Sequence, residues 1–182
     1  ADSAVVQTFA GDEITIAFLE GLMLGNYQFA RYLSAPEKKS AALKSLCWAH
    51  ENAPEQAIIE LNAVAHAVFL ARDLVNEPHS HFDTLKLAEA AREAGRTFGF
   101  SVDVLGKDKI VSLGMGGLLA VNQASSVPPQ FCILEWKPAG ARNTKPVVLI
   151  GKGVVYDTGG LSLKTPEGME SMKCDMAGAA AV

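Results

Sequence analysis

Apolar and polar residues follow one another in patterns that predict helices first and short strands later. Residues 14–33 have apolar positions at helical spacing, although Gly21 and Gly25 weaken a helix there. The clearest helix follows Pro54, where apolar residues recur at three- and four-residue steps and so share one face. These residues are Leu61, Val64, Val68, Ala71 and Val75. Pro78 ends this helix, because the residue before a proline is pushed away from helical angles.

The second half of the chain mixes one more helix with short apolar runs. Asp83 or Thr84 can cap the helix at its start, and Gly99 lies near its end. The stretch 100–105 then alternates apolar and polar residues, as a half-buried strand does. Further apolar runs are 118–121, 131–136 and 147–150, and the last is continuous, which is typical of a strand buried on both faces. The order predicts an α/β fold beginning near Pro54, with a mixed, largely parallel central sheet flanked by helices.

Composition narrows the function classes. The chain has 182 residues, of which 49% are hydrophobic and 20% charged, so it is globular. A net charge of −4 and a pI of about 5.6 do not favour nucleic acid or an anionic membrane as partner. The sequence shows no signal peptide and no run able to span a bilayer. Cys47, Cys132 and Cys174 form no C-x-x-C pair, so no disulfide framework is expected and a cytoplasmic location fits.

The candidate chemistry is concentrated in residues 151–182. Lys152 lies between two glycines directly after the apolar run 147–150, where open α/β sheets place their ligand sites. Asp157, Lys164 and Asp175 follow in glycine-rich surroundings. Carboxylates held in this way can coordinate divalent cations, and one carboxylate can bridge two of them. A lysine near a dication can become a neutral ligand, whereas a charged lysine can stabilise a tetrahedral intermediate.

Several motifs together resemble the M17 leucyl aminopeptidases, the cytosol aminopeptidase family. The motifs are GKGVVYDTGGLSLK (151–164), CDMAGAAAV (174–182), ARDLVNEP (71–78), LGMGGLLAVNQAS (113–125) and EGLMLGNYQFARY (20–32). The resemblance covers nearly the whole chain. It implies that residues 1–53 are the end of an N-terminal domain with a connecting helix. Residues 54–182 would then be the first part of a zinc-exopeptidase-like catalytic domain.

The resemblance also implies an activity and its residues. The family releases N-terminal, leucine-like residues from peptides, using a water activated by two metal ions. Lys152 and Asp175 would ligate one metal, Asp157 would bridge both, and Lys164 would be the catalytic lysine that polarises the scissile carbonyl. Met172 would line the pocket for the first side chain of the substrate. Three further residues would also contact substrate, namely Lys152, Asp157 and Lys164. The resemblance implies Zn²⁺, Mn²⁺ or Mg²⁺, bicarbonate as a further cofactor, and a hexamer.

One family motif has no match in this sequence. The second signature, NTDAEGR, would supply the remaining carboxylate ligands and an arginine for bicarbonate. We therefore expect the chain to be a piece of a longer protein, to carry about half of an active site and to be inactive by itself. The alternatives are a catalytically incomplete fragment, a structural or DNA-binding member of the same family, or a small-molecule module that uses its glycine-rich turns for phosphate.

Simpler structural roles compete with these chemical ones. An aspartate in a glycine-rich loop usually forms a turn, so Asp157 points to metal binding only together with the other charged positions. His79 and His81 could ligate a metal, but loop residues between two helices are the favoured interpretation, by roughly four to one. Cys174 is interpreted as a small buried residue, and 114–117 as a backbone turn.

Overall fold

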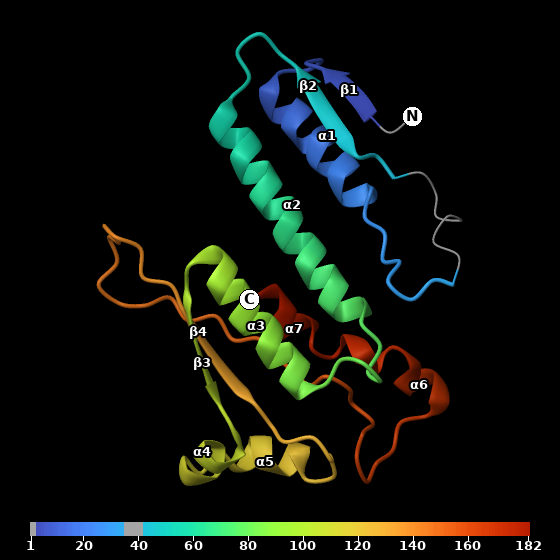
Figure 1. Ribbon diagram of the computed structural model, residues 1–182, viewed down its shortest axis with the longest axis vertical. Coiled ribbons are helices and arrows are strands. Elements are labelled where there is room, and N and C mark those ends of the chain that lie inside the picture. The colour runs from blue at the N-terminus through green and yellow to red at the C-terminus, as the bar shows by residue number, and fades with distance from the viewer. Residues whose placement is uncertain (1–2, 35–41) are drawn as a thin grey trace. The chain divides into compact units, whose positions relative to one another are not determined.

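The computed structural model describes residues 3–34 and 42–182 (Figure 1). The chain divides into two compact units, Ala1–Asp73 and Leu74–Val182, and α2 (Glu55–Asn76) contributes residues to both. The predicted division at residue 53/54 stays a prediction. No helix in the described ranges is long and apolar enough to cross a membrane.

The first unit contains a parallel pair of strands connected through a helix. β1 (Ser3–Gln7) and β2 (Ser45–Ala49) are parallel, with Ser3 opposite Ser45. α1 (Asp12–Gly25) lies between them in sequence and is shorter than the predicted helix. It ends at Gly25, and the Asn26 N–H still donates to the carbonyls of Leu22 and Met23. The Asn26 side-chain amide exchanges two 2.8 Å hydrogen bonds with the backbone of Leu43, so it is tied to another segment and the helix does not continue to residue 33.

The helix predicted after Pro54 is confirmed as α2. Leu61 on the predicted face is buried, and the last three positions of that face are half-buried. Val64 is exposed instead, and the neighbouring Ala65 is fully buried. The buried stripe therefore passes one residue away from the predicted one at this turn of the helix.

The second unit contains the remaining elements. They are α3 (Thr84–Phe98), β3 (Ser101–Leu105), α4 (Lys107–Ser112), α5 (Gly116–Asn122), β4 (Phe131–Glu135), α6 (Pro166–Glu170), the 3₁₀ helix η2 (Met172–Cys174) and α7 (Ala177–Ala181). The predicted cap of α3 is confirmed, because the Asp83 side chain accepts a 3.0 Å hydrogen bond from the Lys86 N–H. Gly99 ends α3 in the left-handed conformation that glycine adopts easily. β3 and β4 are antiparallel, and α3 packs against them (Figure 1).

The mixed α/β class is confirmed, but the sheet is smaller than predicted. The described residues form two two-stranded sheets, one parallel and one antiparallel. The run 118–121 lies in α5. The prediction that 147–150 is a strand buried on both faces is wrong for the described residues. These four residues belong to no strand and are 70–90% exposed, because no neighbouring strand pairs with them in the described part of the chain.

Close backbone contact between α3 and β3 depends on Gly95. This residue is buried, and its carbonyl accepts hydrogen bonds from the N–H groups of Gly99 and Phe100. A Cβ atom at position 95 would lie 2.7 Å from Val102 Cγ2 and 2.8 Å from the Phe100 carbonyl oxygen. Both distances are shorter than van der Waals contact, so only glycine fits without movement of the strand.

We therefore predict that Gly95→Ala lowers the free energy of unfolding by about 1–3 kcal/mol, the usual cost of overpacking a core. Gly117→Ala is the matched control, because a Cβ at residue 117 meets nothing within 4 Å. That change should be neutral or stabilising by up to about 1 kcal/mol. Urea-induced unfolding measures both variants, and equal stabilities for the two would contradict the packing account.

Candidate metal centre

The structure brings the four charged residues of the candidate site together as two ion pairs. Lys152 Nζ lies 2.8 Å from Asp175 Oδ1, and Lys164 Nζ lies 3.3 Å from Asp157 Oδ2. The two pairs also interact electrostatically, because the charge of Asp157 contributes to raising the pKa of Lys152. All four residues belong to the second unit. Their roles as metal ligands and catalytic groups stay predictions.

The loop that carries Asp157 is closed by its own backbone. Asp157 Oδ1 accepts a 2.8 Å hydrogen bond from the Gly159 N–H, and the Lys164 N–H donates to the Thr158 carbonyl at 3.0 Å. Gly159 has a φ of 87°, and a Cβ there would collide with the Ser162 carbonyl oxygen. Asp157 therefore does form a turn, as the simpler interpretation expects, while its second oxygen is paired with Lys164.

Glycines also explain why Lys152 reaches Asp175. A Cβ on Gly151 would lie 2.5 Å from the Gly178 carbonyl oxygen and 2.6 Å from Ala179 Cα. The Ala179 N–H donates to the Lys152 carbonyl at 2.9 Å. The start of α7 is thus pressed against the backbone of residues 151–152, which places Asp175 beside the lysine. The small residues that follow Asp175 form this helix, with the sequence AGAAA.

The surroundings of Lys152 and Asp157 favour the charged forms of these two residues. The hydrogen bond to Asp175, followed by the charges of Asp175 and Asp157, raises the pKa of Lys152. The Gly159 N–H, followed by Lys164, lowers the pKa of Asp157. Without a cation, Lys152 is therefore an ammonium group rather than a neutral ligand. Only a bound dication could favour loss of its proton.

One atom of the site tests whether a cation fits. The Asp175 side chain is only 18% exposed, and its Oδ2 is buried. This oxygen accepts no hydrogen bond from any described residue. A buried carboxylate oxygen without a partner is unfavourable, and bound metal is one way to satisfy it. Carboxylate oxygens suit hard and borderline divalent cations. The residues fit a cation, but within the described ranges no three His, Cys, Asp or Glu side chains gather around one point.

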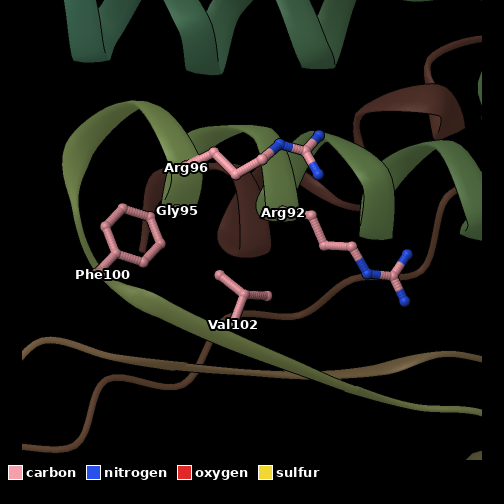
Figure 2. Close-up of a pocket in the computed structure, with 5 residues that line it drawn as sticks. All are labelled: Arg92, Gly95, Arg96, Phe100 and Val102. Atoms are coloured by element: carbon pink, nitrogen blue, oxygen red, sulfur yellow. The ribbon is translucent and has the colours of Figure 1, made fainter.

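Two shallow, open pockets in the described residues lie away from these four residues. One, of about 300 Å³, lies between α3 and β3 and is lined by Arg92, Gly95, Arg96, Phe100 and Val102 (Figure 2). Its arginines are paired with glutamates of α3, since Arg96 lies 2.8 Å from Glu89 and Arg92 lies 3.5 Å from the same residue. Met172 lines neither this cavity nor the second, smaller one in the first unit. Its place in a substrate pocket stays a prediction.

Three contacts near the site were not predicted from the sequence. The His79 ring stacks on Tyr156 with 5.0 Å between centroids, and the Tyr156 hydroxyl donates to the Met169 carbonyl at 3.1 Å. Lys173 Nζ donates to the Asn76 carbonyl at 2.9 Å. The H-x-H spacing was the available signal for His79. The interpretation of that pair as loop residues is confirmed, because both lie in the turn between α2 and α3.

The interpretation of Cys174 as a buried residue is wrong. Cys174 lies in η2 and is exposed, because η2 turns its neighbours Met172 and Lys173 toward the protein instead. Cys47 and Cys132 are free as well.

The mixed α/β fold and the paired acids and lysines define the site, and comparison with known proteins identifies the family. A model of the cytosol aminopeptidase family, catalytic domain, matches residues 69–182. The chain therefore belongs to the cytosol aminopeptidase family, as its motifs predicted.

Known relatives extend the match to nearly the whole chain. The "Probable cytosol aminopeptidase" of Chlorobaculum tepidum is 43% identical over 94% of this chain and 36% of its own length. The crystal structure of the cytosol aminopeptidase from Coxiella burnetii has a TM-score of 0.81 at 31% identity, over 98% of this chain and 37% of that one. The bottromycin maturation enzyme BotP in complex with Mn has a TM-score of 0.83 at 34% identity, over 100% of this chain and 39% of that one. The chain thus spans about a third of the length of its curated relatives.

The electrostatics of Asp157 give a prediction that needs no metal. In the metal-free protein its carboxyl group should titrate below the ordinary aspartate pKa, and Lys164→Met should raise that pKa part of the way back, because the Gly159 hydrogen bond remains. A depressed folded-state pKa stabilises the fold above the unfolded-state pKa. That contribution is lost as the pH falls through the folded value. Carboxyl ¹³C NMR titration measures the pKa, and an unshifted Asp157 would contradict the geometry of this loop.

Proposed function

We propose that the protein is a metal-dependent aminopeptidase that releases N-terminal, leucine-like residues from peptides. Membership of the cytosol aminopeptidase family supports the peptidase activity. The observation that carries the metal dependence is the buried, unpartnered Asp175 Oδ2, on a carboxylate whose other oxygen pairs with Lys152. This chain would supply one side of the catalytic centre.

Three residues of the chain would hold the cations. Asp175 would ligate through the oxygen that now has no partner, Lys152 through its amine after losing a proton, and Asp157 through the oxygen that Lys164 now contacts. Two divalent ions, Zn²⁺, Mn²⁺ or Mg²⁺, would supply Lewis-acid polarisation of the scissile carbonyl and activation of a water. The solved structure of BotP in complex with Mn, a neighbour at 34% identity, is consistent with a manganese-compatible fold.

The remaining residues would act on the substrate. Lys164 is half-buried, and its Nζ forms an ion pair with Asp157 Oδ2 at 3.3 Å. Once a cation takes over that carboxylate, the ammonium group of Lys164 would be released to hydrogen-bond the carbonyl oxygen and stabilise its developing negative charge. Met172, half-buried in η2 three residues before Asp175, would contact the first side chain of the peptide.

The cofactor, assembly and location complete the proposal. Bicarbonate would need a binding residue outside the four described above, and we expect it to be held by a part of the family's catalytic domain that this chain does not match. A hexamer and a cytoplasmic location are proposed by analogy with the family. They agree with relatives that carry the name cytosol aminopeptidase.

One observation favours a second candidate for the chain taken by itself. The described residues gather only two carboxylates and one lysine, fewer ligands than two cations require, and the chain spans about a third of its relatives. The 182 residues alone would then be catalytically incomplete, or would serve a structural or DNA-binding role.

Asp157→Asn in the intact protein tests the proposed activity. The substitution keeps the size of the side chain but removes the charge that would bridge two cations. Hydrolysis of leucine p-nitroanilide in the presence of Mn²⁺ should fall by at least about 10³-fold. EDTA should abolish the activity of the unmodified protein. The matched control is Asp103→Asn, at an exposed residue of β3, which should leave turnover unchanged.

The outcomes separate the two candidates. Turnover that survives both Asp157→Asn and EDTA would contradict a metal-dependent peptidase. Calorimetric binding of Mn²⁺ by the 182-residue chain that Asp157→Asn abolishes, without turnover, would support the incomplete form. Turnover by the 182-residue chain alone would exclude that form.

A further inference from the structure

We propose that the short segment Asn76–His79, at the end of α2, is a brace that positions the two acid-bearing segments of the candidate site relative to each other. This inference rests on the proposed function for its purpose, and on contacts within the second unit for its geometry. Lys173 attaches one acid-bearing segment to the brace, and Tyr156 attaches the other. Lys173 and His79 are therefore assigned as positioning residues.

The first attachment fixes the segment of Asp175. Lys173 lies in η2, two residues before Asp175, and its Nζ donates to the carbonyl of Asn76 at 2.9 Å. Asn76 is the last residue of α2, where helix carbonyls lack partners within the helix and favour a positive charge. The Asp175 N–H continues the turn by donating to the Met172 carbonyl at 3.2 Å. The position of the carboxylate therefore depends on a lysine held at a helix end.

The second attachment fixes the segment of Asp157. The His79 ring lies nearly parallel to that of Tyr156, with an interplanar angle of 23°. Tyr156 directly precedes Asp157, and its hydroxyl donates to the Met169 carbonyl in α6. The tyrosine is thus held at both its ring face and its hydroxyl. This limits how far the neighbouring aspartate can move.

The two attachments meet on one stiff piece of chain. Only two residues, Glu77 and Pro78, separate Asn76 from His79. Glu77 is buried, and the proline ring fixes φ at its position. The Pro78 carbonyl also accepts hydrogen bonds from the N–H groups of His81 and Phe82, at 2.9 and 3.0 Å. Because this segment has so little conformational freedom, it can fix the distance between the segments that carry Asp157 and Asp175. None of its residues is proposed as a metal ligand.

The brace is tested with paired substitutions. Lys173→Met removes the donor and keeps an unbranched side chain, while Lys173→Arg keeps a cationic donor. His79→Ala removes the ring, while His79→Phe keeps a stacking partner. The matched control for Lys173 is Lys137→Met, at a surface lysine whose Nζ lies 2.8 Å from Glu135 Oε1. The matched control for His79 is His66→Ala, at an exposed position of α2.

Amide hydrogen exchange of the metal-free 182-residue protein is the direct measurement. Lys173→Met should speed exchange of the Cys174 and Asp175 amides by about 5-fold, and His79→Ala should do the same for the Gly159 and Lys164 amides. Lys173→Arg and His79→Phe should restore most of the protection. Exchange that changes in neither segment, or in only one, would overturn the brace. So would an equal rise in the β3–β4 amides, which would show general loss of stability.

Mn²⁺ affinity, measured by calorimetry, separates this inference from the proposed function. Each disrupting substitution should weaken Mn²⁺ binding by about 10-fold, as loss of an outer-shell support commonly does, and each conservative one by much less. Should the unmodified chain bind no Mn²⁺, or bind it regardless of Asp157→Asn and Asp175→Asn, the metal function fails, while the exchange rates still decide whether the brace exists. Unchanged affinity in Lys173→Met and His79→Ala, with normal dependence on both aspartates, would overturn the brace alone.

Discussion

The candidate site depends on a carboxylate whose two oxygens have opposite surroundings. One oxygen of Asp175 is paired with Lys152 at 2.8 Å, and the other is buried without a hydrogen-bond donor from the described residues. Leaving a buried oxygen in this condition opposes folding, so it persists only where the surrounding packing enforces it. Here that packing is the contact of Gly151 with the start of α7 and the complete burial of Met176.

The two acids of the candidate site are each paired with a lysine. Lys152 pairs with Asp175 and Lys164 pairs with Asp157, so each acid has a positively charged partner. A dication entering such a site would replace one lysine and compete with the other for the carboxylate oxygens. The different roles proposed for the two lysines come from the family motif. In the structure each lysine pairs with a different acid, and Lys152 is more open to solvent than Lys164.

Local sequence features predicted the local structure well. Asp83 and Gly99 specified both ends of α3 because capping is decided by a few neighbouring residues. The alternation in 100–105 and the motif around Lys152 and Asp157 likewise correspond to a strand and to a glycine-held turn. The sheet was predicted less well. Periodicity identifies 147–150 as apolar, but burial of a strand depends on partners far away in sequence, and the described residues provide none. The His79–Tyr156 and Lys173–Asn76 contacts were missed for the same reason, since they join residues 77 and 97 positions apart.

The central claim is that the open oxygen of Asp175 belongs to a metal site shared with Asp157 and Lys152. The most direct measurement is the zinc anomalous signal in crystals of the protein grown or soaked with Zn²⁺. We expect a peak about 2.0–2.2 Å from Asp175 Oδ2, with Asp157 or Lys152 in the same coordination shell. A peak bound only by other residues, or an Asp175 Oδ2 that meets a protein donor and no ion at saturating Zn²⁺, would contradict it.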